Sequence, residues 1–147
     1  LLPHRGGTRP PRLAVGAAQR HSVALFRRAA RMTDCTVYYN PACSKCRALL
    51  ALLQERGIAA RLVDYRQTPP SAQELTELTA LLGDTAAQLL RRDEPEYAEL
   101  GWGEREPTAG DVVTALLRFP QLMQRPVVVH GARALIARPP ERALDLF

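Results

Sequence analysis

The chain has 147 residues, 46 % of them hydrophobic, which is enough for one domain with a single filled core. No apolar run approaches the roughly 20 residues that a membrane-spanning helix needs, so the sequence argues against a transmembrane protein and a membrane partner. The formal net charge of +5 is typical of nucleic-acid-binding proteins, but the distribution of that charge argues against this class.

The positive charge lies at the start of the chain. Residues 1–31 contain seven arginines and no acidic residue, whereas residues 32–147 hold 13 basic against 15 acidic side chains, a balance of −2. We therefore expect a basic extension (1–31) and a folded domain (32–147), with no nucleic-acid partner. Three interpretations of the extension stay open: a gene-start error upstream of a true start at Met32, a disordered tail, or an organelle transit peptide. Abundant arginine beside a single lysine, Lys45, is typical of a GC-rich bacterial genome and favours the first.

The folded part is predicted to begin with a strand, a helix and a second strand. The run Cys35–Tyr39 is rich in β-forming residues and predicts the first strand. Residues 44–56 predict a helix, stopped by Gly57. Apolar side chains recur there at the spacing of one helix face, at Cys46, Leu49, Leu50 and Leu53. Residues 59–65 predict a second strand, parallel to the first because a helix joins them.

Two helices are predicted next. Ser71 and Glu74 form a capping box, which predicts a helix from there to Leu82, ended by Gly83. Asp84 is predicted to cap a further short helix that runs to about Arg91.

The following segment predicts turns and then another helix. Residues 95–103 are rich in turn-forming residues and show little periodicity. Thr108 is predicted to cap a helix that continues through Phe119. The predicted apolar face of this helix consists of Val112, Val113, Leu116 and Leu117.

The C-terminal part is predicted to return to strands. Residues 127–129 and 134–137 predict two strands joined by a tight turn over residues 130–132. Pro139 is suited to the first position of a final helix that contains Leu144 and Leu146. The order β-α-β, helices, β-β, α predicts an α/β domain with a thioredoxin-like mixed sheet and a helical insertion between its halves.

Cys43 is the strongest candidate for chemistry. It lies between the first predicted strand and the first predicted helix, where free backbone N–H groups and the helix dipole favour a thiolate. Lys45 and Arg47 add positive charge in the first turn, and we expect them to stabilise that thiolate. Because the thiolate is the nucleophilic form, we predict a reactive cysteine. The alternative is a small buried apolar residue, the usual role of a free cysteine.

Cys46 has two interpretations that the sequence leaves open. It lies on the predicted apolar face of its helix, which favours core packing. Its C-x-x-C spacing from Cys43 favours a resolving thiol that attacks an adduct on Cys43. Cys35 lies within the predicted first strand, and we expect it to be inert.

Cysteine and histidine usage argues against a disulfide framework and against a metal site. Three cysteines, two of them in C-x-x-C spacing, are untypical of a secreted protein and indicate the reducing cytoplasm. A structural zinc site needs about four ligands, and no second ligand pair accompanies the single C-x-x-C motif. We therefore expect no metal.

Three arginines are candidate anion ligands by their position. Arg125 and Arg138 each precede a proline at the edge of a predicted strand, and Arg91 closes a predicted short helix. A planar guanidinium group can bind a tetrahedral oxyanion through two hydrogen bonds. The alternative for each of them is a solvated surface residue.

With these residues in place, residues 32–147 resemble the glutaredoxin-coupled arsenate reductase family, the ArsC-like proteins. The matching motifs have the order and separations of the family, and their combination is far more specific than one C-x-x-C. They are Tyr39–Arg47, Leu89–Arg92 followed by Glu96-Tyr97, Leu100-Gly101, Gln124–Val129, and Ala137–Glu141.

The resemblance implies roles for individual residues. Cys43 corresponds to the nucleophile of the family, and Arg91, Arg125 and Arg138 correspond to its oxyanion-binding arginines. Arg47 falls at the family's arginine after the cysteine loop. The resemblance also implies a cis peptide bond before Pro126, as in the thioredoxin-like fold of the family.

The resemblance further implies a reaction without a metal or a bound organic cofactor. The Cys43 thiolate attacks arsenate, and glutathione then acts as co-substrate while arsenite leaves. A glutaredoxin finally removes glutathione from Cys43.

Two departures from the family pattern matter. Position 46 is often serine in enzymes that use glutathione and glutaredoxin alone. The presence of Cys46 here opens an alternative, in which Cys43 and Cys46 form a disulfide that thioredoxin reduces. Some family enzymes have histidine where this chain has Tyr39.

The C-x-x-C motif also occurs in Spx-type relatives, redox-sensing proteins that bind RNA polymerase without turning over arsenate. The three arginines favour the enzyme, since a disulfide switch needs no oxyanion ligands.

Overall fold

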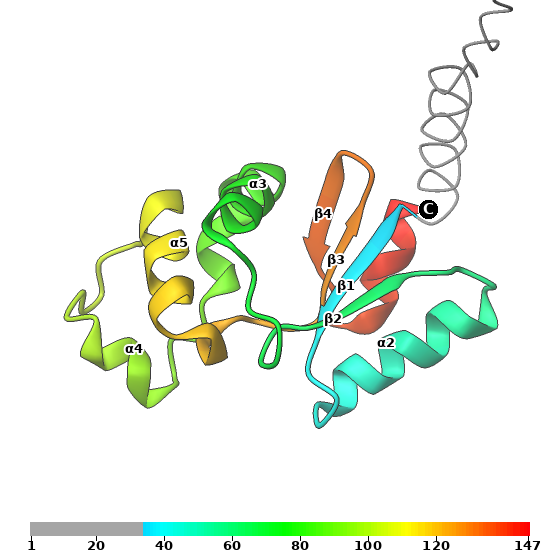
Figure 1. The fold of residues 1–147 in the computed structure, drawn as a ribbon, viewed down its shortest axis with the longest axis horizontal. Coiled ribbons are helices and arrows are strands. Elements are labelled where there is room, and N and C mark those ends of the chain that lie inside the picture. The colour runs from blue at the N-terminus through cyan, green and yellow to red at the C-terminus, as the bar shows by residue number, and fades with distance from the viewer. Residues whose placement is uncertain (1–33) are drawn as a thin grey trace, which may run out of the picture. The chain divides into compact units, whose positions relative to one another are not determined.

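Residues 34–147 are described by a computed structural model, which runs from strand β1 (Cys35–Tyr39) to the C-terminal 3-10 helix η3 (Pro140–Leu146) (Figure 1). These residues belong to one compact unit. The expectations for residues 1–31 and for Met32 lie outside the described residues. In the described part, every helix is too short or too polar to cross a bilayer.

The sheet has four strands in the order β2-β1-β3-β4. β1 pairs in parallel with β2 (Arg61–Asp64) and antiparallel with β3 (Val127–His130), which in turn pairs antiparallel with β4 (Arg133–Ile136). The predicted mixed sheet and the parallel relation of the first two strands are confirmed. The element order also confirms the thioredoxin-like arrangement with a helical insertion.

Side-chain alternation along the strands gives the sheet two apolar faces. On one face Val37 and Val128 pack in a cluster with helix α2 (Ser44–Glu55) and η3. On the other face Tyr38 and Val127 pack in a cluster with the helical insertion. The insertion consists of α3 (Ala72–Leu82), η1 (Gly83–Leu89), α4 (Pro95–Glu99), α5 (Ala109–Arg118) and η2 (Pro120–Leu122). The sheet therefore forms the middle layer, and each face has its own core.

Local capping confirms the starts of two predicted helices. In α3 the Ser71 hydroxyl accepts the backbone N–H of Glu74, and the Glu74 carboxylate accepts the N–H of Ser71. Thr108 and Asp111 form the same reciprocal pair at α5. Gly83 ends α3 with a positive φ of 55°.

Parts of the helical insertion differ from the prediction. Asp84 does not cap a helix, because η1 is a 3-10 helix that already begins at Gly83. It also ends before Arg91, because Leu90 is extended and bridges to Met123. The segment predicted as turns contains the short helix α4, which has Pro95 in its first turn.

Other differences are small shifts at element ends. Strand β2 is shorter than predicted, and β4 begins and ends one residue earlier. α2 and α5 each end one residue earlier, at Glu55 and Arg118. The final helix is a 3-10 helix that starts at Pro140 rather than Pro139. Leu117, predicted on the apolar face of α5, is 50 % exposed, whereas Ala115 is buried instead.

The expected cis bond between Arg125 and Pro126 is confirmed, and the Arg138-Pro139 bond is also cis. These two prolines flank the β3-β4 hairpin. The arginine before each proline therefore lies at the same end of the hairpin, and both of these arginines are candidate oxyanion ligands.

Candidate active site

A short loop between β1 and α2 positions Cys43. The side-chain Oδ1 of the buried Asn40 accepts the backbone N–H of Ala42 at 2.9 Å, and the backbone carbonyl of Asn40 accepts the N–H of Cys43 at 3.0 Å. Cys43 is the extended residue directly before the first turn of α2, and its own carbonyl accepts the N–H of Arg47 at 3.0 Å. The free N–H groups of the helix start are therefore close to the Cys43 sulfur, as the sequence predicted.

The surroundings of Cys43 favour its thiolate. Partial burial by itself raises the pKa of the thiol. Hydrogen bonding from the backbone N–H of Cys46, from the Arg125 guanidinium, from the Cys46 thiol and from the backbone N–H of Lys45 outweighs burial and lowers the pKa to about 7. A large fraction of Cys43 is therefore in the nucleophilic form at neutral pH.

Cys46 has the opposite environment. Its side chain has no exposed surface, and its sulfur accepts the backbone N–H of Asn40 at 3.5 Å. Burial, together with the neighbouring Cys43, raises the pKa of Cys46 to about 12 despite that hydrogen bond. The two cysteines are free, not bonded as a disulfide. Because Cys43 has the lower pKa, the pair carries its negative charge on Cys43.

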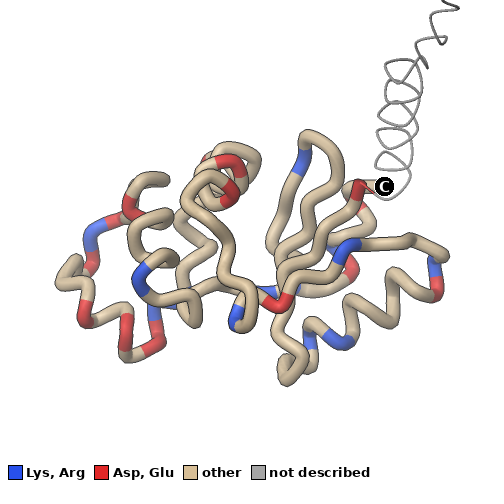
Figure 2. Tube along the Cα trace, viewed as in Figure 1, with Lys and Arg blue, Asp and Glu red and all other residues tan. Residues whose placement is uncertain are grey.

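Lys45 and Arg47 lie in the first turn of α2, where basic residues mark the helix start (Figure 2). Both side chains are exposed. Lys45 acts on Cys43 through its backbone N–H. Stabilisation of the thiolate by the charges of these two side chains stays a prediction.

Arg125 is the arginine that lies beside Cys43. Its backbone N–H donates to the Gln124 side chain at 3.3 Å, and its carbonyl accepts an N–H of the Arg138 guanidinium at 2.9 Å. The Nε atom of Arg125 is buried and has no hydrogen-bond partner. One donor of this guanidinium is thus available to an acceptor inside the site.

Arg91 and Arg138 reach the site less directly. The backbone N–H of Arg91 donates to the Leu122 carbonyl at 2.8 Å, which joins the end of η1 to the segment before β3. Its guanidinium pairs with Glu94 at 2.7 Å and is three-quarters buried. Arg138 holds the backbone of Arg125. Binding of an oxyanion by these arginines stays a prediction.

Tyr65 is a site residue that the sequence analysis missed. It is 1 % exposed, and its hydroxyl has no hydrogen-bond partner. Burial raises its pKa, and the groups that act on it electrostatically belong to Arg125, Cys46 and Arg91. A signal for it existed: Tyr65 directly follows β2, and parallel strands β1 and β2 end at the same edge of the sheet, where Cys43 lies.

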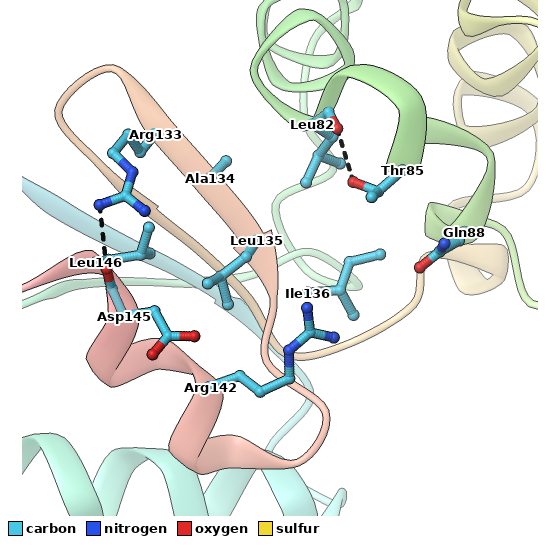
Figure 3. A pocket seen from close by; sticks show the side chains of 10 residues that line it. All are labelled: Leu82, Thr85, Gln88, Arg133, Ala134, Leu135, Ile136, Arg142, Asp145 and Leu146. Atoms are coloured by element: carbon cyan, nitrogen blue, oxygen red, sulfur yellow. Dashed lines mark hydrogen bonds between the residues drawn. The ribbon is translucent and has the colours of Figure 1, made fainter.

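Other candidate groups lie outside this site or do not form one. Cys35 is buried in β1, where burial and Asp34 raise its pKa, so it remains a thiol. Within residues 34–147, no three His, Cys, Asp or Glu side chains gather as metal ligands. A pocket of about 320 Å³ between β4, η1 and η3 holds Arg133 and Arg142 but no cysteine (Figure 3).

Comparison with known proteins gives matches along most of the described domain. The ArsC family model matches residues 38–146. The uncharacterized protein YfgD of Escherichia coli K12 is 39 % identical, covering 75 % of this chain and 93 % of the relative. An arsenate reductase of Rhizobium meliloti is 37 % identical, covering 76 % and 80 %. The solved structure of an arsenate reductase from Vibrio cholerae superposes with a TM-score of 0.70 at 36 % identity, covering 77 % and 97 %.

Proposed function

This chain belongs to the ArsC family, and we propose that it is an arsenate reductase in which Cys43 is the nucleophile. Curated relatives and a solved neighbour that carry the name arsenate reductase support the activity. The observation that carries the assignment of Cys43 is its pKa of about 7 next to the Arg125 guanidinium. A thiolate beside a cation can approach an anionic substrate that would otherwise repel it.

In the first step the Cys43 sulfur forms a bond to arsenic, and one arsenate oxygen takes up protons and leaves as water. Arsenic remains pentavalent in this step. The negative charge of the substrate and the thiolate is offset by the N-terminus of α2 and by Arg91, Arg125 and Arg138.

In the second step glutathione is oxidised together with Cys43. The glutathione sulfur attacks the Cys43 sulfur, the sulfur–arsenic bond breaks, and its electron pair stays on arsenic. Arsenite with trivalent arsenic leaves, and a disulfide joins Cys43 to glutathione. A glutaredoxin then exchanges this disulfide and restores the thiol. No metal or bound organic cofactor takes part.

Cys46 offers a second route for the same electrons. Its sulfur lies within hydrogen-bonding reach of Cys43, so it can attack Cys43 in place of glutathione and expel arsenite. The product is a Cys43–Cys46 disulfide, which a thioredoxin would reduce. The raised pKa of Cys46 keeps it protonated until Cys43 has reacted.

The partners in this function are arsenate, glutathione, and a glutaredoxin or thioredoxin, all in the reducing cytoplasm. Neither a nucleic acid nor a membrane is required. The relatives named arsenate reductase favour this enzyme over an Spx-type protein that binds RNA polymerase.

A coupled assay tests the function. Purified protein with arsenate, glutathione, glutaredoxin and NADPH should oxidise NADPH, and Cys43→Ser should lose this activity while Cys35→Ser keeps it. Activity that survives in Cys43→Ser would refute the mechanism. Wild-type protein that binds RNA polymerase but turns over no arsenate would favour the Spx-type function.

The same assay with thioredoxin in place of glutaredoxin tests Cys46. We expect wild-type protein to accept thioredoxin and Cys46→Ser to lose that ability while it retains the glutaredoxin-coupled rate. Equal thioredoxin-coupled rates in both proteins would leave Cys46 as a core residue only.

A further inference from the structure

Tyr65 buries a hydroxyl group that no residue of the described chain satisfies. The side chain is 1 % exposed, and its oxygen has no hydrogen-bond partner. Most buried polar groups in proteins are hydrogen-bonded, and leaving one unpaired destabilises the folded state. An unpaired hydroxyl inside a reaction site is therefore a candidate hydrogen-bond donor to a substrate that binds there.

The neighbours of Tyr65 place its hydroxyl in the active site. The Arg125 guanidinium is near enough to act on the Tyr65 oxygen as a donor, although outside hydrogen-bond geometry, and Cys46 and Arg91 also influence the hydroxyl electrostatically. Because a guanidinium only donates, it leaves the hydroxyl hydrogen without an acceptor. Arg125 and Cys46 are the side chains that also hydrogen-bond Cys43. Tyr65 thus lies buried at the edge of the sheet where the parallel strands β1 and β2 end, next to side chains that contact Cys43.

Two buried donors in this place have no acceptor. One is the Tyr65 hydroxyl, which burial keeps protonated, and the other is Nε of Arg125. The nearby thiolate of Cys43 is one acceptor, and it already receives several hydrogen bonds. A tetrahedral oxyanion carries several acceptor oxygens on one centre, which fits two unpaired donors beside a nucleophile.

We propose that Tyr65 is a ligand of the oxyanion, and that its hydroxyl donates a hydrogen bond to an oxygen of the arsenate that Cys43 attacks. The inference rests on the proposed function for the identity of the substrate. Tyr65 contributes a neutral donor from the side of the site that solvent does not reach. As sulfur attacks arsenic, negative charge gathers on the oxygens, and this hydrogen bond becomes stronger.

Burial of a phenol alone does not identify a ligand. Tyr97 also buries an unpaired hydroxyl, but it packs edge-on against Trp102 in the helical insertion. Tyr38 is buried too, and its hydroxyl donates to Glu74 at 3.4 Å. Tyr65 differs from both because its hydroxyl adjoins the arginine and the thiol that contact the nucleophile.

Protection of Cys43 from alkylation tests the proposal without requiring turnover. Iodoacetamide alkylates the Cys43 thiolate, and bound arsenate or phosphate should slow that reaction. In Tyr65→Phe we expect half-protection to need about 10- to 100-fold more oxyanion, the range for a hydrogen bond to a charged group. Tyr38→Phe, the matched control, should be protected as well as wild type.

A second readout separates a ligand from a structural role. Without oxyanion, the pH at which alkylation is half-maximal should be the same in Tyr65→Phe and wild type, because Arg125 and the helix start still act on Cys43. Half-protection at equal oxyanion concentration in all three proteins would overturn the proposal. An increased midpoint in Tyr65→Phe would also overturn it, since Tyr65 would then act by placing Arg125.

The outcome for Tyr65 is distinguishable from the outcome for arsenate reduction. Protection by phosphate that is weakened in Tyr65→Phe, with no arsenate turnover in wild type, would support the ligand and reject the reductase. Wild-type protein that no oxyanion protects would overturn both.

Discussion

Two cysteines one helical turn apart have opposite acidities. Cys43 precedes the first turn of α2 and receives hydrogen bonds from that turn and from Arg125, so its pKa falls to about 7. Cys46 points into the core from the same turn, and burial is the main reason that its pKa rises to about 12. The proposed roles of Cys43 as nucleophile and Cys46 as resolving thiol therefore rest on which side of one helix each sulfur occupies.

The first prediction concerns the pH dependence of Cys43. Its alkylation rate should rise with pH to a half-maximal value near pH 7, because a lowered pKa leaves half of the thiol ionised there. Below that midpoint the rate should fall about tenfold per pH unit. Mass spectrometry of digested protein after brief iodoacetamide treatment measures the sites. Modification of Cys35 or Cys46 before Cys43 at pH 7 would contradict the assignment.

The second prediction separates two arginines. Arg125→Ala should raise the alkylation midpoint of Cys43, because the guanidinium is one of the groups that lower its pKa. The same substitution should also lower kcat/KM for arsenate by about 10-fold or more, the usual loss for a charge-assisted contact. Arg47→Ala is the comparison, since the charge of an exposed side chain is screened by solvent and its loss should shift the midpoint less than the loss of Arg125 does. A shift in Arg47→Ala as large as in Arg125→Ala would contradict this ranking of the two arginines.

At the scale of elements, the sequence predicts the helix ends that depend on local signals and misses those that depend on long-range contacts. The capping boxes at Ser71 and Thr108 are made within four residues, and both predicted helix starts are correct. The end of η1 depends instead on the bridge between Leu90 and Met123, residues that are distant in sequence. A cap assigned to Asp84 from local sequence alone could not anticipate that contact.

The third prediction is a stability difference at α3. Ser71→Ala removes a hydroxyl that accepts the N–H of Glu74, and we expect it to lower the free energy of unfolding by about 1 kcal/mol. Thr76→Ala, at an exposed position inside the same helix, should be neutral or slightly stabilising because alanine has the higher helix propensity. Urea titration followed by circular dichroism measures both. Equal destabilisation by the two substitutions would argue against the cap.

At the scale of the whole molecule, the site is assembled from segments far apart in the chain. Cys43 follows β1, Tyr65 follows β2, and Arg125 precedes β3. The sequence predicts Cys43 because its activation is local to one loop and one helix start. For Tyr65 the sequence offers only its place directly after a strand, because its unpaired hydroxyl becomes evident only when β1 and β2 lie side by side.

The fourth prediction follows from the location of the described core and site. Residues 34–147 belong to one compact unit, so a shortened chain that begins at Met32 should keep the unfolding temperature and the arsenate kinetics of the full chain. Its formal charge should change from +5 to −2, and it should bind an anion exchanger instead of a cation exchanger near neutral pH. A lower unfolding temperature or kcat/KM would show that residues 1–31 contribute to the fold or the reaction.

The position of β1 between β2 and β3 ties the reactivity of Cys43 to the order of folding. Pairing of β1 with β2 closes a loop of some 25 residues, whereas pairing with β3 closes one of some 90 residues, which costs more entropy and is slower. Arg125 reaches Cys43 when the second pairing is made. An unfolded chain therefore has an ordinary thiol at this position. During refolding at pH 7, the rate of Cys43 alkylation should accordingly rise when β1 pairs with β3, and it therefore reports when that pairing forms.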